Sequence, residues 1–203
     1  MSGSLLKFQR TVKIGGRRYP VVKIGNQLWM AENLDYVDEN ITIGGDLSIS
    51  IPKAYYYDQD KELNGPEGRK INLLYNYAAV NYLMNNSSTI FPDGWHVCSD
   101  AEVSTLINFI GSDEGIKLSK GDISWKGSLW IGTNDYGFSW LPGGTRWESD
   151  GQFHSIGEEA CMWSSNFNLI YIENTKNDSS IHTQIGGAYD GASSNIRLVK
   201  NLT

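Results

Sequence analysis

Apolar and polar residues alternate along the first thirty positions of the chain, with glycine-containing pairs at the breaks. Such alternation over Thr11–Ile14, Arg17–Ile24 and Gln27–Met30 is typical of half-buried strands. Gly15-Gly16 and Gly25-Asn26 separate these runs, and glycine supplies the positive φ that tight hairpin turns require. The pattern predicts an antiparallel meander of three strands.

Two segments in the middle of the chain have helical spacing. Over Leu73–Met84 apolar residues recur every three or four positions, which predicts a first helix. Ser99 and Glu102 form a capping box, in which each side chain satisfies a free backbone N–H of the other residue. Apolar residues with helical period continue to Gly111, so we predict a second helix over residues 100–110.

Residues 38–70 are mostly irregular, with one short strand expected at Tyr55–Tyr57, and the pattern changes again after residue 120. Short apolar runs between glycine turns predict later strands at Trp125, Leu129–Ile131, Phe138–Leu141, Cys161–Trp163, Leu169–Ile172 and Ile196–Val199. Helices early and strands late indicate an α+β fold. We expect residues 1–17 to form an N-terminal arm with the first strand, and residues 18–203 to form a single domain.

The composition is that of a globular protein, with 40% hydrophobic and 12% aromatic residues in 203. A net charge of -6 argues against nucleic acid or an anionic membrane as a partner. No apolar run approaches the roughly 20 residues of a membrane span, so we expect no membrane insertion. The first seven residues contain no signal-peptide core.

Residue patterns that would indicate catalysis are not found in the sequence. The histidines, at positions 96, 154 and 182, have no neighbouring ligand at metal-site spacing. Glu158 and Glu159 are adjacent, and neighbours on an extended segment point to opposite faces. The two cysteines, Cys98 and Cys161, are far apart, and two free thiols are favoured over a bridge.

The stretch from Gly143 to Ser165 combines turn glycines with side chains that no folding rule demands. Gly143, Gly144, Gly151 and Gly157 suit positive φ or close approach of backbone segments. Phe153, Ile156 and Trp163 look like inward anchors, and we assign Trp163 to the core. The remaining side chains have neither a strand nor a helix period, which favours a binding surface. We predict that the ligand contacts are Trp147, Glu148, Asp150, His154, Glu158, Glu159, Met162, Phe167, Asn168 and Tyr171.

A series of motifs, in order along the chain, resembles the Fibrobacter succinogenes major paralogous domain, a family common in surface proteins. The resemblance covers roughly residues 18 to 202 and rests on Val22–Leu34, Tyr75–Ala79, Pro92–Glu102, Gly137–Ser139, Leu141–Gly144, Phe153, Ile156-Gly157, Trp163–Ser165 and Ile196–Lys200. His96 lies in one of these motifs, where we expect it to serve the core or a helix cap.

The resemblance implies a C-type-lectin-like fold, with two helices, a mixed and mainly antiparallel sheet, and long loops that carry the ligand site. Cys98 stands where the family usually has proline, and the family's terminal cysteine is missing, so an inherited disulfide is not expected. The fold is shared with formylglycine-generating enzymes and with variable proteins of diversity-generating retroelements, and residues 147–171 look like a diversified region. The motifs that bind sugars through calcium in this fold are absent, and Thr133–Asp135 matches one of them only in part.

From these observations we expect a non-catalytic, adhesin-like protein that binds a cell-surface glycan or a protein receptor. It would act outside the cell, on a cell surface or on a virion, with no cofactor. Bound calcium is left open, because the oxygen ligands of calcium leave little trace in a sequence. Oligomer formation is left open as well. The alternatives are an enzyme of the formylglycine-generating or glycan-processing type, and a structural module of a surface assembly.

Overall fold

A computed structural model describes residues 10–45, 48–57, 73–121, 123–125, 128–173, 182–184 and 191–202. The helices are α1 (Tyr77–Asn85), α2 (Ser87–Ile90), α3 (Asp100–Ile110) and α4 (Glu114–Leu118). The strands are β1 (Arg10–Ile14), β2 (Arg17–Ile24), β3 (Gln27–Met30), β4 (Thr42–Ile43), β5 (Lys53–Tyr55), β6 (Leu74–Asn76), β7 (His96–Val97), β8 (Ile123–Trp125), β9 (Ser128–Trp130), β10 (Thr145–Trp147), β11 (Phe153–His154), β12 (Glu159–Trp163), β13 (Leu169–Glu173), β14 (His182–Gln184), β15 (Ala192–Ser194) and β16 (Leu198–Asn201).

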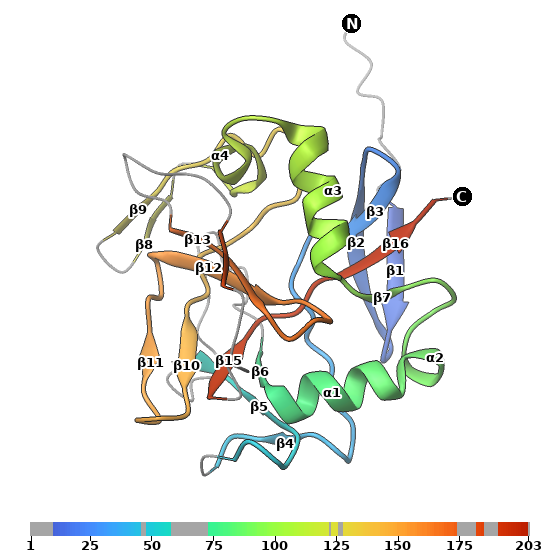
Figure 1. The fold of residues 1–203 in the computed structure, drawn as a ribbon, viewed down its shortest axis with the longest axis vertical. Helices are drawn as coiled ribbons and strands as arrows, with labels where there is room; N and C mark the ends of the chain where they lie inside the picture. The colour runs from blue at the N-terminus through green and yellow to red at the C-terminus, as the bar shows by residue number, and fades with distance from the viewer. Residues whose placement is uncertain are drawn as a thin grey trace, which may run out of the picture.

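These strands form two larger sheets and two smaller ones. The five-stranded sheet has the order β1-β2-β3-β16-β7, and the six-stranded sheet has the order β11-β10-β15-β6-β5-β4. β12, β13 and β14 form a three-stranded sheet, and β8 and β9 form a ribbon. Among the described strands every pairing is antiparallel except that of β4 with β5. The fold is therefore α+β with mainly antiparallel sheets, as the sequence predicted (Figure 1).

The strongest local patterns are confirmed. β1, β2 and β3 form the predicted meander, and β1 pairs with β2 along its whole length. α3 begins after Ser99, whose side chain accepts a hydrogen bond from the Glu102 backbone N–H while Glu102 returns the bond, so the capping box is present. α3 ends at Gly111, which has a positive φ of 77°.

Three predicted elements differ in the structure, and two short helices were not predicted. Leu74–Asn76 is a strand, and the helix begins only at Tyr77, because apolar spacing in a short window fits a buried strand as well as a helix. Phe138–Leu141 is not a strand; only Trp140 pairs, in an isolated bridge with Ser119. The predicted strand at Tyr55–Tyr57 lies two residues earlier, and the short helices α2 and α4 were not predicted.

Residues 1–9 of the predicted arm and the irregular stretch 58–70 lie outside the described residues.

β16 runs between two hydrophobic clusters, and its alternating side chains enter them in turn. Leu198 packs in one cluster with Ala79, Val80 and Leu83 of α1. Val199 packs in the other cluster with residues of α3, including Leu106. Successive side chains of a strand point to opposite faces, so Leu198 and Val199 contact different clusters. α1 and α3 therefore pack in different hydrophobic cores. α3 lies beside β2 and β3, and α1 lies in the lower part of the molecule, above β4 (Figure 1).

Buried polar side chains tie the C-terminal part of the chain into this frame. Arg197 is 1% exposed and donates to the carbonyl oxygens of Met30, Phe138 and Ser139. Trp163 is fully buried, as predicted, and its indole N–H donates to the Tyr75 carbonyl at 2.7 Å. These bonds satisfy donors that would otherwise be buried without partners.

Both cysteines are free and buried, in agreement with the predicted thiols. Burial raises the pKa of the Cys98 thiol far above its ordinary value. A buried thiol of raised pKa is a poor nucleophile, because the thiolate is the reactive form.

Candidate functional site

The predicted contact residues do not form one surface; they lie in three parts of the fold. The β10–β11 hairpin carries Trp147, Glu148, Asp150 and His154. The turn before β12 and the β12–β13 pair carry Glu158, Glu159, Met162 and Tyr171. The turn between β12 and β13 carries Phe167 and Asn168.

Two of the predicted contacts are wrong because their side chains are buried. Met162 is fully buried and packs with Ile170 and Ile172. β12 is covered on both faces over its last four residues, and such a strand shows no alternation in the sequence. Glu148 is 8% exposed, and its carboxylate accepts a hydrogen bond from the Ser193 hydroxyl.

Glu148 belongs to a buried polar row that runs across the six-stranded sheet. The strand register places Arg146 opposite Ser193, and Ser193 opposite Asn76. Arg146 forms an ion pair with Glu148 at 3.4 Å, and its guanidinium lies 4.0 Å from the centre of the Tyr55 ring. Burial raises the pKa of the Glu148 carboxyl, and the Arg146 charge and the Ser193 hydroxyl offset this only in part. The row is an internal link between strands, away from solvent.

The exposed residues of the β10–β11 hairpin form a local pair. His154 Nε2 lies 3.2 Å from Asp150 Oδ2, and both side chains are over 40% exposed. Trp147 is half-buried and packs against the core cluster that contains Trp163. The Asp150 and His154 side chains therefore remain accessible to a ligand, whereas Trp147 also supports the core.

Only part of the predicted glycine frame has the expected backbone. Gly144, Gly151 and Gly157 have positive φ, and Gly143 does not. At Gly144 a Cβ atom would lie 2.3 Å from the His154 carbonyl oxygen, so no larger residue fits between these segments. This close approach fixes β10 against the segment that follows β11.

The β12–β13 turn holds a phenylalanine in a backbone conformation that disfavours it. Phe167 has a φ of 60°, in the left-handed region, where a residue with a Cβ costs roughly 1–2 kcal/mol. The turn is closed by the Phe167 N–H, which donates to the Ser164 carbonyl, and by the Ser164 N–H, which donates to the Asn168 carbonyl. Strained residues of this kind cluster at functional sites.

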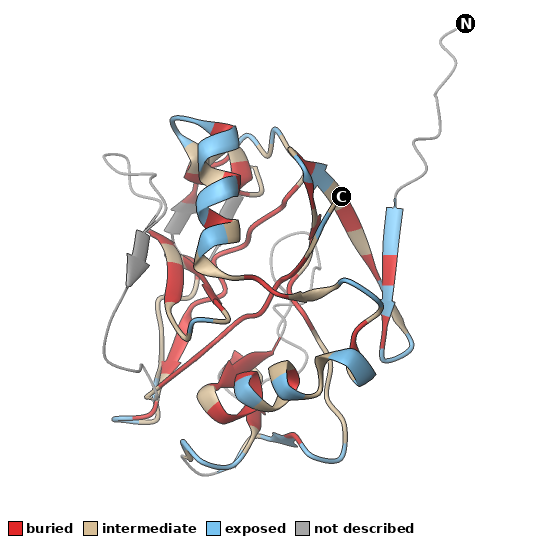
Figure 2. Cartoon of the chain, turned by 45° about the vertical axis from the view of Figure 1, so that its right-hand side comes forward, coloured by how far each residue is buried: buried red, intermediate tan, exposed pale blue. Residues whose placement is uncertain are grey.

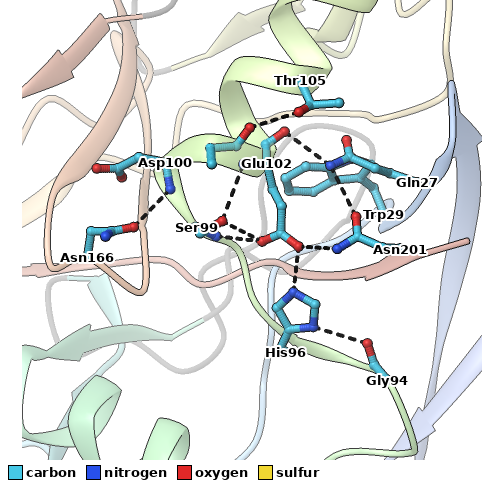
Figure 3. Close-up of polar contacts among 11 residues, drawn as sticks. Gln27, Trp29, Gly94, His96, Ser99, Asp100, Glu102, Thr105, Asn166 and Asn201 are labelled. Carbon is cyan, nitrogen blue, oxygen red and sulfur yellow. Dashed lines mark hydrogen bonds and ion pairs between the residues drawn. The ribbon is translucent and has the colours of Figure 1, made fainter. Parts of the chain in front are cut away.

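The same turn is pinned to the start of α3. The Asn166 side-chain oxygen accepts from the Asp100 backbone N–H at 3.0 Å, and the Asn168 amide donates to Asp100 Oδ2 at 2.6 Å. The turn thus lies between α1 and the first residues of α3 (Figure 1), and Figure 3 shows the Asn166 contact. With both flanking asparagines fixed, the position of Phe167 is fixed as well.

Phe167 stacks on Tyr77, the first residue of α1. The two ring centres lie 4.4 Å apart and the rings are inclined by 35°. Both residues are half-buried, so part of each ring faces solvent. We call Phe167 and Tyr77 the aromatic pair.

Tyr77 also lines a groove of about 330 Å³ between α1 and the segment before β5. The described residues that line it are Ile49, Ser50, Pro52, Tyr77, Ala78, Asn81, Tyr82, Asn85 and Asn86. None of these nine residues is charged, although 20% of the chain is. We call this the α1 groove. Its volume is at the lower end of the roughly 300–1,000 Å³ typical of small-molecule sites.

Asn76 joins the two walls of the α1 groove. Its side-chain oxygen accepts from the Ala79 N–H, which caps α1, and from the Lys53 N–H at 3.0 Å. Its amide donates to the carbonyl oxygens of Ser48, at 2.5 Å, and Ile51, at 2.9 Å. The side chain is fully buried and all its bonds are used, so it positions the helix and the opposite wall together.

Sequence patterns pointed to the aromatic side of this site through Phe167, but not to α1 or to the opposite wall. The first helix was predicted from its apolar spacing alone, and residues 38–70 were expected to be mostly irregular. One signal could have found the groove: residues 71–92 contain no charged side chain but have asparagine at positions 72, 76, 81, 85 and 86. A solvated helix face usually carries Lys or Glu, so this composition is unusual for an exposed surface.

A second depression, of about 360 Å³, lies beside β2 and is lined by Thr11, Arg18, Pro20, Ala31, Glu32, Gly137 and Ser139. Ser139, one of these lining residues, donates its N–H to Asn134 Oδ1 at 2.7 Å. Arg18 and Glu32 bring opposite charges to this depression, in contrast to the α1 groove.

His96 forms part of a bonded network at the start of α3 (Figure 3). His96 Nε2 lies 2.6 Å from Glu102 Oε1, which also accepts from the Asn201 amide at 2.6 Å. The hydrogen bond to Glu102 raises the pKa of His96 despite partial burial. Burial would raise the pKa of Glu102, but the bonds from His96 and from the Ser99 amide and hydroxyl outweigh it and lower that pKa to about 2. The network ties β7 and β16 to α3, which agrees with the capping role expected for His96.

Among the described residues no group of three or more His, Cys, Asp or Glu side chains is placed to hold a metal ion. No helix in the described part of the chain is long and apolar enough to cross a membrane.

In the comparison with known families, the model of the Fibrobacter succinogenes major domain matches residues 22–200. Comparison with curated proteins and with solved structures finds no match.

Proposed function

This chain belongs to the Fibrobacter succinogenes major domain family, and we propose that it is a non-catalytic, adhesin-like protein that binds a ligand on a cell surface. We further propose that its α+β architecture is of the C-type-lectin-like kind. Two main helices against mainly antiparallel sheets, and long connections such as 131–144, support that assignment.

The observation that carries the proposal is the aromatic pair. Asn166 and Asn168 flank Phe167, and asparagine tolerates a φ of 60° far better than phenylalanine does. The fold therefore keeps the aromatic side chain at the one position of the turn that strains it, where it stacks on Tyr77. Half-exposed aromatic side chains on a rigid support are common anchors in recognition surfaces.

The surrounding surface has the same character. Asn168, next to Phe167 in the chain, is fixed by Asp100, and Tyr77 also lines the α1 groove. We propose that the recognition surface consists of the aromatic pair, Asn168 and the α1 groove. The exposed Asp150, His154 and Glu158 lie on other turns, and we retain them as outer contacts. The partner is a surface glycan or a protein receptor, met outside the cell or from a virion.

A test is to replace Phe167 by glycine and measure binding to a panel of bacterial and epithelial cells by flow cytometry. Glycine adopts the left-handed conformation without strain, so relief of about 1–2 kcal/mol offsets the packing lost with the ring. We expect Phe167→Gly to fold with nearly unchanged melting temperature and to lose most of its cell binding.

The matched control is Asp113→Gly. Asp113 has a similar φ of 59° at the start of α4, with an exposed side chain that makes no capping bond. This variant introduces glycine at a matching φ without removing an aromatic ring, so it should bind as the wild type does. Equal binding by wild type and Phe167→Gly, or no cell binding by the wild type, would contradict the proposal.

A further inference from the structure

The lining of the α1 groove matches one class of ligand. We propose that the groove binds an uncharged saccharide, without calcium, through the asparagines of α1. This inference rests on the proposed binding function and adds to it the ligand class and the groove as its site.

The polar groups of the groove are side-chain amides. Asn81 and Asn85 are exposed, four residues apart on α1, and therefore lie on the same helix face. The hydrogen bond between them is long, at 3.4 Å from Asn85 Nδ2 to Asn81 Oδ1. Each amide has two donor hydrogens and an acceptor oxygen, and a sugar hydroxyl also both donates and accepts. Two amides one turn apart can thus bond to neighbouring hydroxyls.

The apolar part of the groove consists of ring faces and an exposed isoleucine. The aromatic pair fixes the Tyr77 ring, and the Tyr82 hydroxyl is held by Asp38 and by the Asn40 amide, each at 2.8 Å. Ile49, on the opposite wall, is 49% exposed. A pyranose ring has C–H faces that pack on such surfaces, and fixed rings reduce the ordering cost of binding.

The charges in and around the α1 groove disfavour acidic ligands. The nine described residues of the lining include no Lys, Arg or His to pair with a carboxylate or sulfate. Asp38 accepts a hydrogen bond from the hydroxyl of Tyr82, a lining residue, and would repel an anion. A ligand charge placed here would be desolvated without a partner, which is costly. The same lining has no carboxylate for calcium, whose usual ligands in proteins include Asp and Glu oxygens.

The experiment measures binding of the purified protein to an array of neutral oligosaccharides of glucose, galactose, mannose and N-acetylglucosamine, together with sialylated and sulfated oligosaccharides. Each array is run with calcium and with EDTA. We expect binding to neutral members only, unchanged by EDTA. Asn81→Ala with Asn85→Ala should weaken binding by about tenfold or more, because two amide bonds are lost.

The matched control is Asn108→Ala, since Asn108 is also exposed on a helix but belongs to α3, which packs on the other core. It should bind as the wild type does. Binding to acidic members only, loss of binding in EDTA, or equal losses in the Asn81/Asn85 and Asn108 variants would each overturn the inference.

Cell binding separates this inference from the proposed function. If the wild type binds cells and Phe167→Gly does not, but mild periodate oxidation of the cells leaves binding intact while protease treatment removes it, the partner is a protein. The saccharide inference then fails and the binding function stands. If the wild type binds neither cells nor any oligosaccharide, both fail.

Discussion

α1 and α3 are the two longest helices of the described chain, and their starts are built differently. α3 is capped within four residues, by Ser99 and Glu102 acting on each other. α1 is capped by Asn76, whose side chain also bonds to Ser48, Ile51 and Lys53, which are 23 to 28 positions away in the sequence. The first cap depends only on neighbouring residues, whereas the second joins α1 to the stretch from Ser48 to Lys53.

The outer faces of the two helices also differ. α3 has Asp100 and Glu102 in its first turn, where their negative charges interact favourably with the helix dipole. The outer side of α3 is exposed along its length (Figure 2). α1 has no charged residue in its first or last turn, and its outer face lines the groove. α3, which has a local cap and a charged first turn, stabilises the fold. α1, which has a cap that bonds to a distant segment and no charged residues at its ends, provides the candidate site.

The largest effect is expected at Asn76. Asn76→Ala should lower the free energy of unfolding by about 3 kcal/mol, because it removes a cap worth about 1 kcal/mol and leaves buried backbone groups without partners. Asn76→Ser keeps a capping oxygen but cannot reach Ser48 and Ile51, so it should be about 1 kcal/mol more stable than Asn76→Ala. Urea unfolding followed by circular dichroism measures both differences.

These two variants separate the cap from the link between the groove walls. Asn76→Ser should reduce saccharide binding although the protein remains folded, since the opposite wall is no longer held. If Asn76→Ser and Asn76→Ala are equally stable, the side-chain cap of α1 contributes nothing to the free energy of unfolding. In that case only α3 is stabilised by its cap. Asn81→Ala, on the exposed face of α1, should change stability by no more than about 0.5 kcal/mol.

A smaller effect is expected at the start of α3. Ser99→Ala should cost about 1 kcal/mol, because Glu102 still accepts from the Ser99 backbone N–H while the Glu102 N–H loses the Ser99 hydroxyl and keeps only the Ser99 carbonyl. Ser104→Ala is the control: Ser104 is exposed on the same helix and donates only to the Asp100 carbonyl. Thermal melts should rank Ser99→Ala below Ser104→Ala and the wild type. A loss at Ser99 as large as that at Asn76 would contradict the local character of this cap.

The smallest effect is a pH dependence of the His96–Glu102 pair. The pKa of His96 is raised in the fold, so its contribution is complete below the unfolded value near 6.5 and is lost as pH rises through the folded pKa. The pKa of Glu102 is lowered to about 2, so its contribution is present above its unfolded value and is lost as pH falls towards 2. The stability advantage of the wild type over His96→Gln should therefore be greatest between about pH 4.5 and 6.5 and decline towards pH 9.

Paired urea titrations of wild type and His96→Gln at pH 5.5 and pH 9 measure this difference, since the other titrating groups largely cancel. His96 is 39% exposed, so solvent screens the pair and the effect is small. An advantage that grows with pH would show that the bond to Glu102 does not raise the pKa of His96.

The two helices also show where sequence patterns suffice. The α3 cap and its glycine end were predicted because each depends on neighbours within one turn. The start of α1 was placed too early, because the apolar residues Leu73 and Leu74 fit either element and only pairing with β5 and β15 makes Leu74–Asn76 a strand. Met162 and Glu148 were assigned to the surface because nothing in their neighbours reveals that another layer covers them.

The sequence by itself determined the family, the meander, the α3 cap, the free thiols, the burial of Trp163 and the α+β class. Each of these depends on residue type, short spacing or a set of motifs in fixed order. Only the tertiary structure decided that the predicted contact residues lie in three separate parts of the fold. It also decided that Phe167 stacks on Tyr77, which lies 90 positions earlier in the chain. It alone decided that an amide of α1 holds the opposite wall of the groove. Such contacts depend on how sheets and helices pack, and packing between distant segments leaves no period in the sequence.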